Sequence, residues 1–377
     1  MVMSENNEGR FPSEIVVAYE YCNLGGVATI FKNRVSALRE FGCTIPFRFI
    51  FNKDNGGAPD LVRLSGVTVE IANSDDFPAH VAASVTGIDV PVIVIDNPKL
   101  FEAIKSVAQH VFYEVHTSIP KALGAMQMAD FSSVEKMLCV SNWVKERIEQ
   151  LRVRVDIEKI DVVGNFVETA LFSPPEPGDR PASPGGRRPV IWIGKLNHDK
   201  GVHEFQNIVR LIGDLDVDVT FVTGGGLLPV AVSEFLSFVT VMGRRLPVRW
   251  LHNLDHGSVS ALMKSCALGR GILVSTSRFE SFGLAVLEAM QTGVPVVAAG
   301  VGGLLELLDG CPDLLYECGD IVDADRKIRC LLADTESYSD AVSRVLAGAA
   351  RYNRDAAVRS YARFLGFAID DVHGFLP

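Results

Sequence analysis

Residues 273–308 read LVSTSRFESFGLAVLEAMQTGVPVVAAGVGGLLELL, and this stretch decides the fold. Apolar runs alternate here with glycine turns. The pattern predicts a buried strand over 271–274, a helix from about Gly283 to Thr292, a second strand over 295–299 and another helix from Leu304. This succession is a βαβ unit of a parallel sheet. In such sheets ligands bind beyond the carboxyl ends of the strands.

Two carboxylates eight positions apart, Glu280 and Glu288, mark that expected ligand edge. We expect Glu280 in the loop after the first strand and Glu288 about two turns into the following helix. Carboxylates accept hydrogen bonds from hydroxyls, and helix N-termini offer N–H groups to anions. The layout therefore fits an extended, polyhydroxylated ligand with a diphosphate in its middle.

The same stretch resembles the donor-binding signature of retaining glycosyltransferases with the GT-B fold, specifically family 4. Its E-x7-E pair is Glu280 and Glu288, its G-x-P-V-V-A element matches residues 293–298, and its G-G-x-x-E element matches residues 302–306. The resemblance implies an α/β chain with two Rossmann-like domains facing each other across a cleft. It also implies sugar transfer from a nucleotide-diphosphate donor to an acceptor hydroxyl with retention of configuration. A reading in which both glutamates are merely solvated would leave the two glycine turns unexplained.

Size and composition are those of a two-domain soluble protein. The chain has 377 residues, 48% of them hydrophobic and 22% charged. Its net charge of −10 argues against nucleic acid as a partner and against strong membrane association. The N-terminal MVMSENNEGRFPS lacks a signal-peptide core, and no apolar run reaches the length of a membrane span. Seven cysteines without metal-type spacing indicate buried thiols, so we expect a cytoplasmic protein.

A segment rich in proline and glycine, residues 173–189, divides the chain and predicts a linker. We expect an acceptor-side domain over 1–172, a nucleotide-sugar-binding domain over 190–350 and a helical tail over 351–377. By resemblance, a helix near 356–365 in this tail crosses back to the first domain. The expected strands are 15–19, 44–51, 67–71, 92–96, 110–115, 136–140 and 161–163 in the first domain, and 190–193, 219–222, 248–251, 271–274 and 295–299 in the second.

Two lysines open the second domain, in the segment VIWIGKLNHDKG of residues 190–201. A strand ends at Gly194, and the loop carries Lys195 and Lys200 toward the next helix. Two ammonium groups beside a helix N-terminus form an anion site. The family pattern here is G-R-L-x3-K-G, so Lys200 matches, whereas Lys195 replaces an arginine and loses its bidentate fork. The resemblance assigns both lysines to the donor diphosphate.

Three further turns belong to the donor site by resemblance. Gly25 and Gly26 match the glycine pair of the loop that closes over the donor phosphate and acceptor. Gly224 stands in a glycine-rich turn after a strand. Backbone groups around Asn253 and Leu254 lie against the nucleobase, which leaves the identity of the base open.

His116 ends a strand of the first domain and matches the family's histidine at the reaction centre, where it would contact the transferred sugar or the acceptor. A lone histidine satisfied at a strand end is the alternative. Ser141 is expected to cap the helix that follows it. The segment around Asn165 departs from the family's N-G-V-D, because Phe166 and Glu168 replace glycine and aspartate.

The expected catalytic residues are therefore His116, Glu280 and Lys200. The expected donor-binding residues are Gly25, Gly26, Lys195, Lys200, Gly224, Asn253, Leu254, Glu280, Ser281, Phe282, Gly283, Leu284 and Glu288. No cofactor or metal is expected, because lysines and helix N–H groups would balance the charge of the leaving diphosphate. The acceptor stays open between a saccharide, a lipid-linked glycan and a small metabolite. A sugar-nucleotide epimerase and a catalytically idle nucleotide-binding scaffold are the alternative functions.

Overall fold

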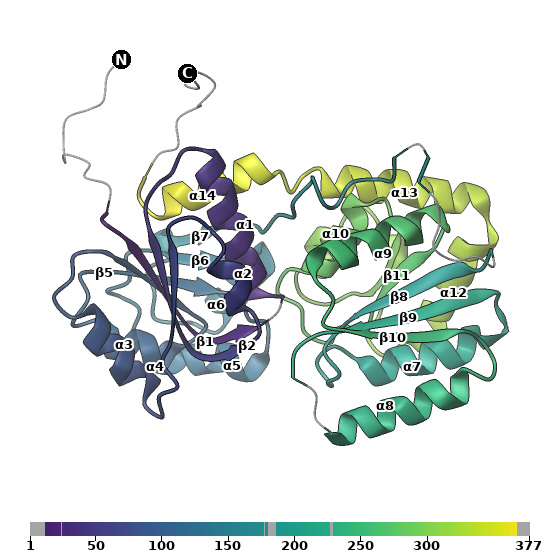
Figure 1. Ribbon diagram of the computed structural model, residues 1–377, viewed down its shortest axis with the longest axis horizontal. Helices are drawn as coiled ribbons and strands as arrows, with labels where there is room; N and C mark the ends of the chain where they lie inside the picture. Colours follow the sequence, from purple (N-terminus) through teal and green to yellow (C-terminus); the bar gives the residue numbers. More distant parts are fainter. Residues whose placement is uncertain (1–11, 24, 177, 180–185, 227–228, 368–377) are drawn as a thin grey trace, which may run out of the picture.

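The computed structural model describes residues 12–23, 25–176, 178–179, 186–226 and 229–367 (Figure 1). Residues 1–11, part of the linker expected over 173–189, and the last ten residues of the tail expected over 351–377 lie outside these ranges. Two parallel sheets with helices on their faces lie side by side. The expected fold class, two Rossmann-like domains of the GT-B type, is confirmed.

The first domain has a seven-stranded sheet of order β3-β2-β1-β4-β5-β6-β7, with every named pair parallel. Its strands are β1 Ile15–Asn23, β2 Phe47–Asn55, β3 Val67–Ile71, β4 Pro91–Ile95, β5 His110–Val115, β6 Met137–Cys139 and β7 Ile160–Val162. The α-helices between them are α1 Val27–Glu40, α2 Ala58–Leu61, α3 Phe77–Val85, α4 Pro98–Ile104, α5 Pro120–Ala125 and α6 Asn142–Gln150.

The second domain has a six-stranded parallel sheet of order β10-β9-β8-β11-β12-β13. Its strands are β8 Arg188–Gly194, β9 Val217–Thr223, β10 Val248–His252, β11 Ile272–Ser275, β12 Val296–Ala299 and β13 Leu315–Tyr316. The α-helices are α7 Val202–Leu211, α8 Pro229–Met242, α9 His256–Leu268, α10 Leu284–Gln291, α11 Leu304–Leu307, α12 Ile321–Ala333, α13 Thr335–Ala349 and α14 Arg354–Phe364.

Three details of the expected elements were wrong. The strand expected over 44–51 begins at Phe47, because the Arg39 guanidinium binds the carbonyls of Cys43 and Ile45 and holds them outside the ladder. The two-residue β13 was missed, since so short a strand carries no periodic signal. Glu288 lies only a little over one turn into its helix, because α10 starts at Leu284.

The loops that carry the expected site residues lie at the two points where the order of the strands reverses, one in each sheet. β1 neighbours β4 in the first sheet, and β8 neighbours β11 in the second. The loops that leave such strand pairs diverge to opposite faces and open a crevice in which ligands bind. The glycine pair follows β1, both lysines follow β8, and Glu280 follows β11.

The last helix joins the two domains. α14 follows α13 of the second domain but lies beside α1 of the first (Figure 1). Its Phe364 ring meets Phe112 of β5 edge to face, with centroids 5.2 Å apart, and Arg354 pairs with Glu40 of α1. Within the described ranges, no helix is both long and apolar enough to cross a bilayer.

Candidate active site

Lys200 and Glu280 meet at the switch point of the second sheet. The Lys200 ammonium donates to Glu280 Oε2 over 2.6 Å, and Ser277 Oγ donates to the same oxygen over 3.3 Å. The loops that carry them touch because residue 201 is glycine. Gly201 has φ +65°, and a Cβ there would stand 1.9 Å from the Thr276 carbonyl oxygen. A side chain at this position would therefore force the two charges apart.

A second glycine contact holds the Glu280 loop from its other side. The Gly303 N–H donates to the Glu280 carbonyl over 2.9 Å, and a Cβ on Gly302 would stand 1.9 Å from that same oxygen. The G-G-x-x-E glycines thus pack on the backbone of Glu280 and Ser281. These glycines contribute to the site by positioning the Glu280 carboxylate.

Lys195 lies across the turn after β9. A Cβ on Gly225 would come 3.7 Å from the Lys195 Cε. Desolvation and then the neighbouring Lys200 charge lower the pKa of the Lys195 ammonium. Asn253 Oδ1 accepts the Gly225 N–H over 3.0 Å, so this side chain fixes the Gly224–Gly225 turn. Among the described residues, Lys195 takes part in no ion pair, whereas Lys200 pairs with Glu280. Two ammonium groups this close together favour a bound anion.

Glu288 occupies a different environment, one residue removed from the first domain. Its carboxylate is buried and lies 3.9 Å from His256 Nε2, which in turn is 3.4 Å from Thr29 Oγ1 on the first turn of α1. Gly26, with φ +58°, precedes that helix. Through His256 and Thr29, Glu288 therefore lies near the turn of Gly25 and Gly26. Burial raises the pKa of Glu288 to about 8.

We expect Glu288→Gln to change how stability depends on pH. A folded pKa of about 8 against an ordinary 4.5 means that the folded chain holds the extra proton between these values. The free energy of unfolding therefore falls as pH rises through this window, by about 1.4 kcal/mol per pH unit for this group. Glutamine mimics the neutral acid, so the variant should melt with wild type near pH 5 and above it near pH 8.5.

Calorimetric melting curves across pH measure this difference. Glu146→Gln, on the exposed face of α6, is the matched control and should follow wild type throughout. Equal melting temperatures of Glu288→Gln and wild type at both pH values would contradict the buried, protonated carboxyl.

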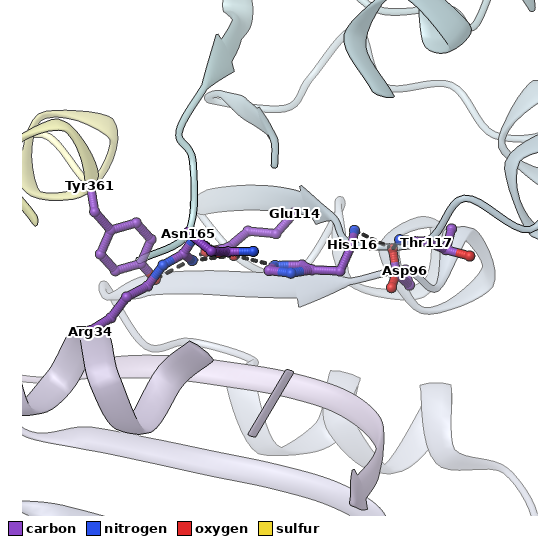
Figure 2. Close-up of polar contacts among 7 residues, drawn as sticks. All are labelled: Arg34, Asp96, Glu114, His116, Thr117, Asn165 and Tyr361. Atoms are coloured by element: carbon purple, nitrogen blue, oxygen red, sulfur yellow. Dashed lines mark hydrogen bonds and ion pairs between the residues drawn. The ribbon is translucent and has the colours of Figure 1, made fainter. Parts of the chain in front are cut away.

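His116 belongs to a buried network in the first domain (Figure 2). Its Nε2 lies 2.7 Å from Glu114 Oε2, which also accepts from Arg34 over 2.7 Å. Tyr361 of α14 donates to Glu114 Oε1 over 3.0 Å. Burial raises the pKa of Glu114, but Arg34 and His116 outweigh it, and the pKa lies below its usual value. His116 Nδ1 is buried without a hydrogen-bond partner among the described residues, which leaves it available to a ligand hydroxyl.

The two domains also touch beside Glu280. Ser141 Oγ donates to the Ser281 carbonyl over 2.7 Å, and the same oxygen caps α6 as expected. Glu306, the last residue of G-G-x-x-E, accepts the backbone N–H groups of Asn142 and Trp143 at the start of α6. The second domain thus supplies the anion for a helix N-terminus of the first.

The remaining expected donor residues differ in what they present. Gly283, with φ +103°, precedes α10, and Leu284 is its first residue, so their N–H groups lie at a helix N-terminus. Phe282 is buried and meets Tyr352 edge to face, so its side chain belongs to the core. Leu254 packs against the core of the second domain.

Several site residues escaped the sequence reasoning, among them Arg34, Tyr361 and His256, whereas Glu306 was expected only as part of the G-G-x-x-E element. Arg34 left a usable signal, because it interrupts the apolar stripe of α1 at helical spacing from Phe31 and Leu38. A charge in such a stripe requires a buried partner. His256 carried no such signal, since its contacts are distant in sequence, Glu288 in its own domain and Thr29 in the other.

Comparison with known proteins shows what parts of the chain are similar to. Residues 187–334 match the family model described as Glycosyl transferases group 1. Among curated relatives, an uncharacterised glycosyltransferase of Methanocaldococcus jannaschii is 27% identical over 209 residues, 54% of this chain and 51% of its own. The lipopolysaccharide core biosynthesis mannosyltransferase LpsB of Rhizobium meliloti is 28% identical over 215 residues, 54% of this chain and 58% of its own. The chain spans about half the length of the curated relatives it matches.

Solved structures extend the likeness to both domains. The Anabaena protein HepE, in complex with UDP and glucose, superposes with a TM-score of 0.75 at 18% identity and covers 94% of this chain and 99% of its own. The fold is GT-B. Sucrose-phosphate synthase of Thermosynechococcus elongatus has the same arrangement, with a TM-score of 0.72, 15% identity, and 93% and 98% of the two chains covered. In GT-B terms, the Lys200–Glu280 pair lies in the cleft-side loops of the second Rossmann-like domain.

Proposed function

We propose that this chain transfers a sugar from a nucleotide-diphosphate donor to an acceptor hydroxyl, with retention of configuration and without a metal. The observation that carries the proposal is the contact of Lys200 with Glu280 beside the cationic Lys195, within residues that match a glycosyltransferase family. The lysines suit a diphosphate, and the carboxylates suit sugar and ribose hydroxyls. The complexes of HepE with UDP and glucose make UDP-glucose the first donor to test.

The reaction breaks the bond between the anomeric carbon and the diphosphate oxygen, and the electron pair leaves with the nucleotide. The acceptor oxygen forms the new bond to that carbon, and its proton passes to the departing phosphate. Lys195, Lys200 and the N–H groups at the start of α10 stabilise the developing negative charge. Glu280 orients the transferred sugar, Glu288 holds the ribose, and His116 Nδ1 accepts a hydrogen bond from a hydroxyl of the sugar or acceptor.

Calorimetry with UDP, GDP and ADP tests the donor site, followed by assays for slow nucleotide release from the matching sugar donor. We expect one diphosphate to bind and its sugar donor to be hydrolysed slowly without acceptor. The α-anomer of the product, formed from an α-linked donor, would establish retention. Absence of binding by all three diphosphates would reject the proposed function.

We expect activity to survive exhaustive chelation with EDTA. The positive charge that faces the leaving group comes from two ammonium groups and backbone N–H groups, so no divalent cation is needed for charge balance. Turnover is measured before and after chelation and again after magnesium or manganese is added back. A loss of turnover that either cation reverses would contradict the expectation.

A further inference from the structure

A hollow of about 410 Å³ lies beside Glu280, between the two domains. This is the size of a small-molecule site. Its first-domain wall includes Ser118 and its second-domain wall includes Glu280, so the hollow borders the expected position of the transferred sugar. Its walls are largely apolar and include Leu123, Trp143, Leu151, Val301 and Leu305. Leu305 is 45% exposed and Trp143 is half-buried, so both present apolar surface that a ligand could cover.

Two arginines line this hollow, Arg147 of α6 and Arg278 of the loop after β11. Within the described part of the chain no ion pair involves Arg147, whose side chain donates to the neutral Gln150. Arg278 forms a long ion pair with Glu204, at 3.9 Å. Glu280, the acidic side chain of the lining, is already neutralised by Lys200. The hollow therefore carries net positive charge.

The chemistry of the lining constrains its occupant. A polyhydroxylated ligand needs many hydrogen-bond partners, whereas this hollow offers few polar side chains besides the two arginines. Guanidinium groups favour phosphate or carboxylate, which they can bind through two parallel N–H bonds. The apolar walls favour an aryl or alkyl surface. The occupant thus combines an anionic group with an apolar body.

We propose that the acceptor of this glycosyltransferase is an anionic amphiphile, with an apolar aryl or alkyl part against Trp143 and Leu305 and a phosphate or carboxylate on Arg147 and Arg278. This inference rests on the proposed function, because it takes Glu280 as the position of the transferred sugar. The acceptor hydroxyl would then point toward Glu280. A free saccharide is disfavoured because it lacks an apolar body. An anionic lipid and a free aryl acid both combine an anionic group with an apolar part.

Calorimetry on the full chain tests this with 1-naphthyl phosphate, inorganic phosphate and 1-naphthol as probes. Saturating nucleoside diphosphate is present, so that Lys195 and Lys200 are occupied. We expect 1-naphthyl phosphate to bind at least about tenfold more tightly than either fragment probe, because it alone supplies both features. The double variant Arg147→Gln/Arg278→Gln should weaken that binding by about tenfold or more. Arg244→Gln, an exposed arginine after α8, is the matched control and should bind like wild type.

Equal affinities for 1-naphthyl phosphate and inorganic phosphate, or binding that the double variant leaves unchanged, would overturn the proposal. Unaltered melting of the double variant ensures that a loss of binding is not a loss of fold. Flotation with phosphatidylcholine vesicles that contain phosphatidic acid then separates the sources. Binding to vesicles that requires both arginines indicates a lipid acceptor, and binding of the free probe alone indicates a small one.

The two proposals fail in different ways. If nucleoside diphosphates bind but 1-naphthyl phosphate does not, the acceptor inference is wrong and the proposed function stands. If no nucleoside diphosphate binds, the proposed function is rejected whatever the naphthyl probe does.

Discussion

Replacing Lys200 with methionine is expected to lower the turnover number by about 10²- to 10³-fold, the usual loss when one charge-stabilising donor is removed. In the free protein Lys200 is held by Glu280 at 2.6 Å. In the proposed reaction, a bound diphosphate would compete for this ammonium and release Glu280 toward the sugar hydroxyls. Methionine keeps the length and apolar character of the stem but stabilises neither the diphosphate nor Glu280.

Stability should change little in this variant. The side chains of Lys200 and Glu280 are 31% and 16% exposed, and ion pairs that reach solvent contribute about 1 kcal/mol or less. Steady-state kinetics of nucleotide release and a melting curve measure the two effects. Lys99→Met, an exposed lysine on α4, is the matched control. Turnover at the wild-type level, or a collapse of the melting temperature, would show that Lys200 is structural.

Replacing Arg34 with methionine is expected to destabilise the fold by about 3–5 kcal/mol, because it leaves a buried carboxylate without its charge partner. Arg34 and Glu114 are 2% and 0% exposed and 2.7 Å apart. Arg34 also donates to Asn165 over 3.3 Å and stacks over the Tyr361 ring, with its Cζ 4.2 Å from the centroid. One substitution thus affects α1, β5, the segment around Asn165 and α14 together (Figure 2).

Denaturant titration gives the free energy of unfolding for this test. Arg48→Met, which breaks the surface pair of Arg48 with Glu14, should cost about 1 kcal/mol or less. Arg34→Met/Glu114→Gln should lose less than the sum of its single variants, since neither charge is then stranded. A cost for Arg34→Met as small as that of the surface control would contradict the buried pair.

Local sequence signals predicted most of the fold. Alternating apolar strands and helices with glycine turns determine a parallel sheet wherever they occur, and eleven of the twelve strand ranges expected here fall on observed strands without a shifted start of several residues. The glycines at 302 and 303 were expected as a turn, and Gly201 only as part of the loop that carries the two lysines. The structure explains why glycine is needed there: a Cβ at 201 or 302 would collide with the backbone of the neighbouring loop.

The site could be predicted only as far as the backbone positions its residues. Lys200 and Glu280 were each placed at a strand end, and parallel strands bring their carboxyl ends to one edge, so their proximity followed from topology. Their direct contact did not, because it depends on side-chain conformations in two loops. The sequence also could not distinguish the environments of Glu280 and Glu288. Glu288 is buried with a raised pKa, whereas Glu280 is partly exposed and paired with lysine.

By itself, the sequence determined the two α/β domains, the loops that carry charge and the glycines that those loops require, because these depend on neighbours within a few turns. Only the tertiary structure decided which distant side chains meet. His256 approaches Thr29 across 227 positions, and Tyr361 reaches Glu114 across 247. The hollow with Arg147 and Arg278 forms where two domains face each other. Such contacts depend on how whole domains pack, and packing energy is spread over many buried residues, so no local pattern encodes it.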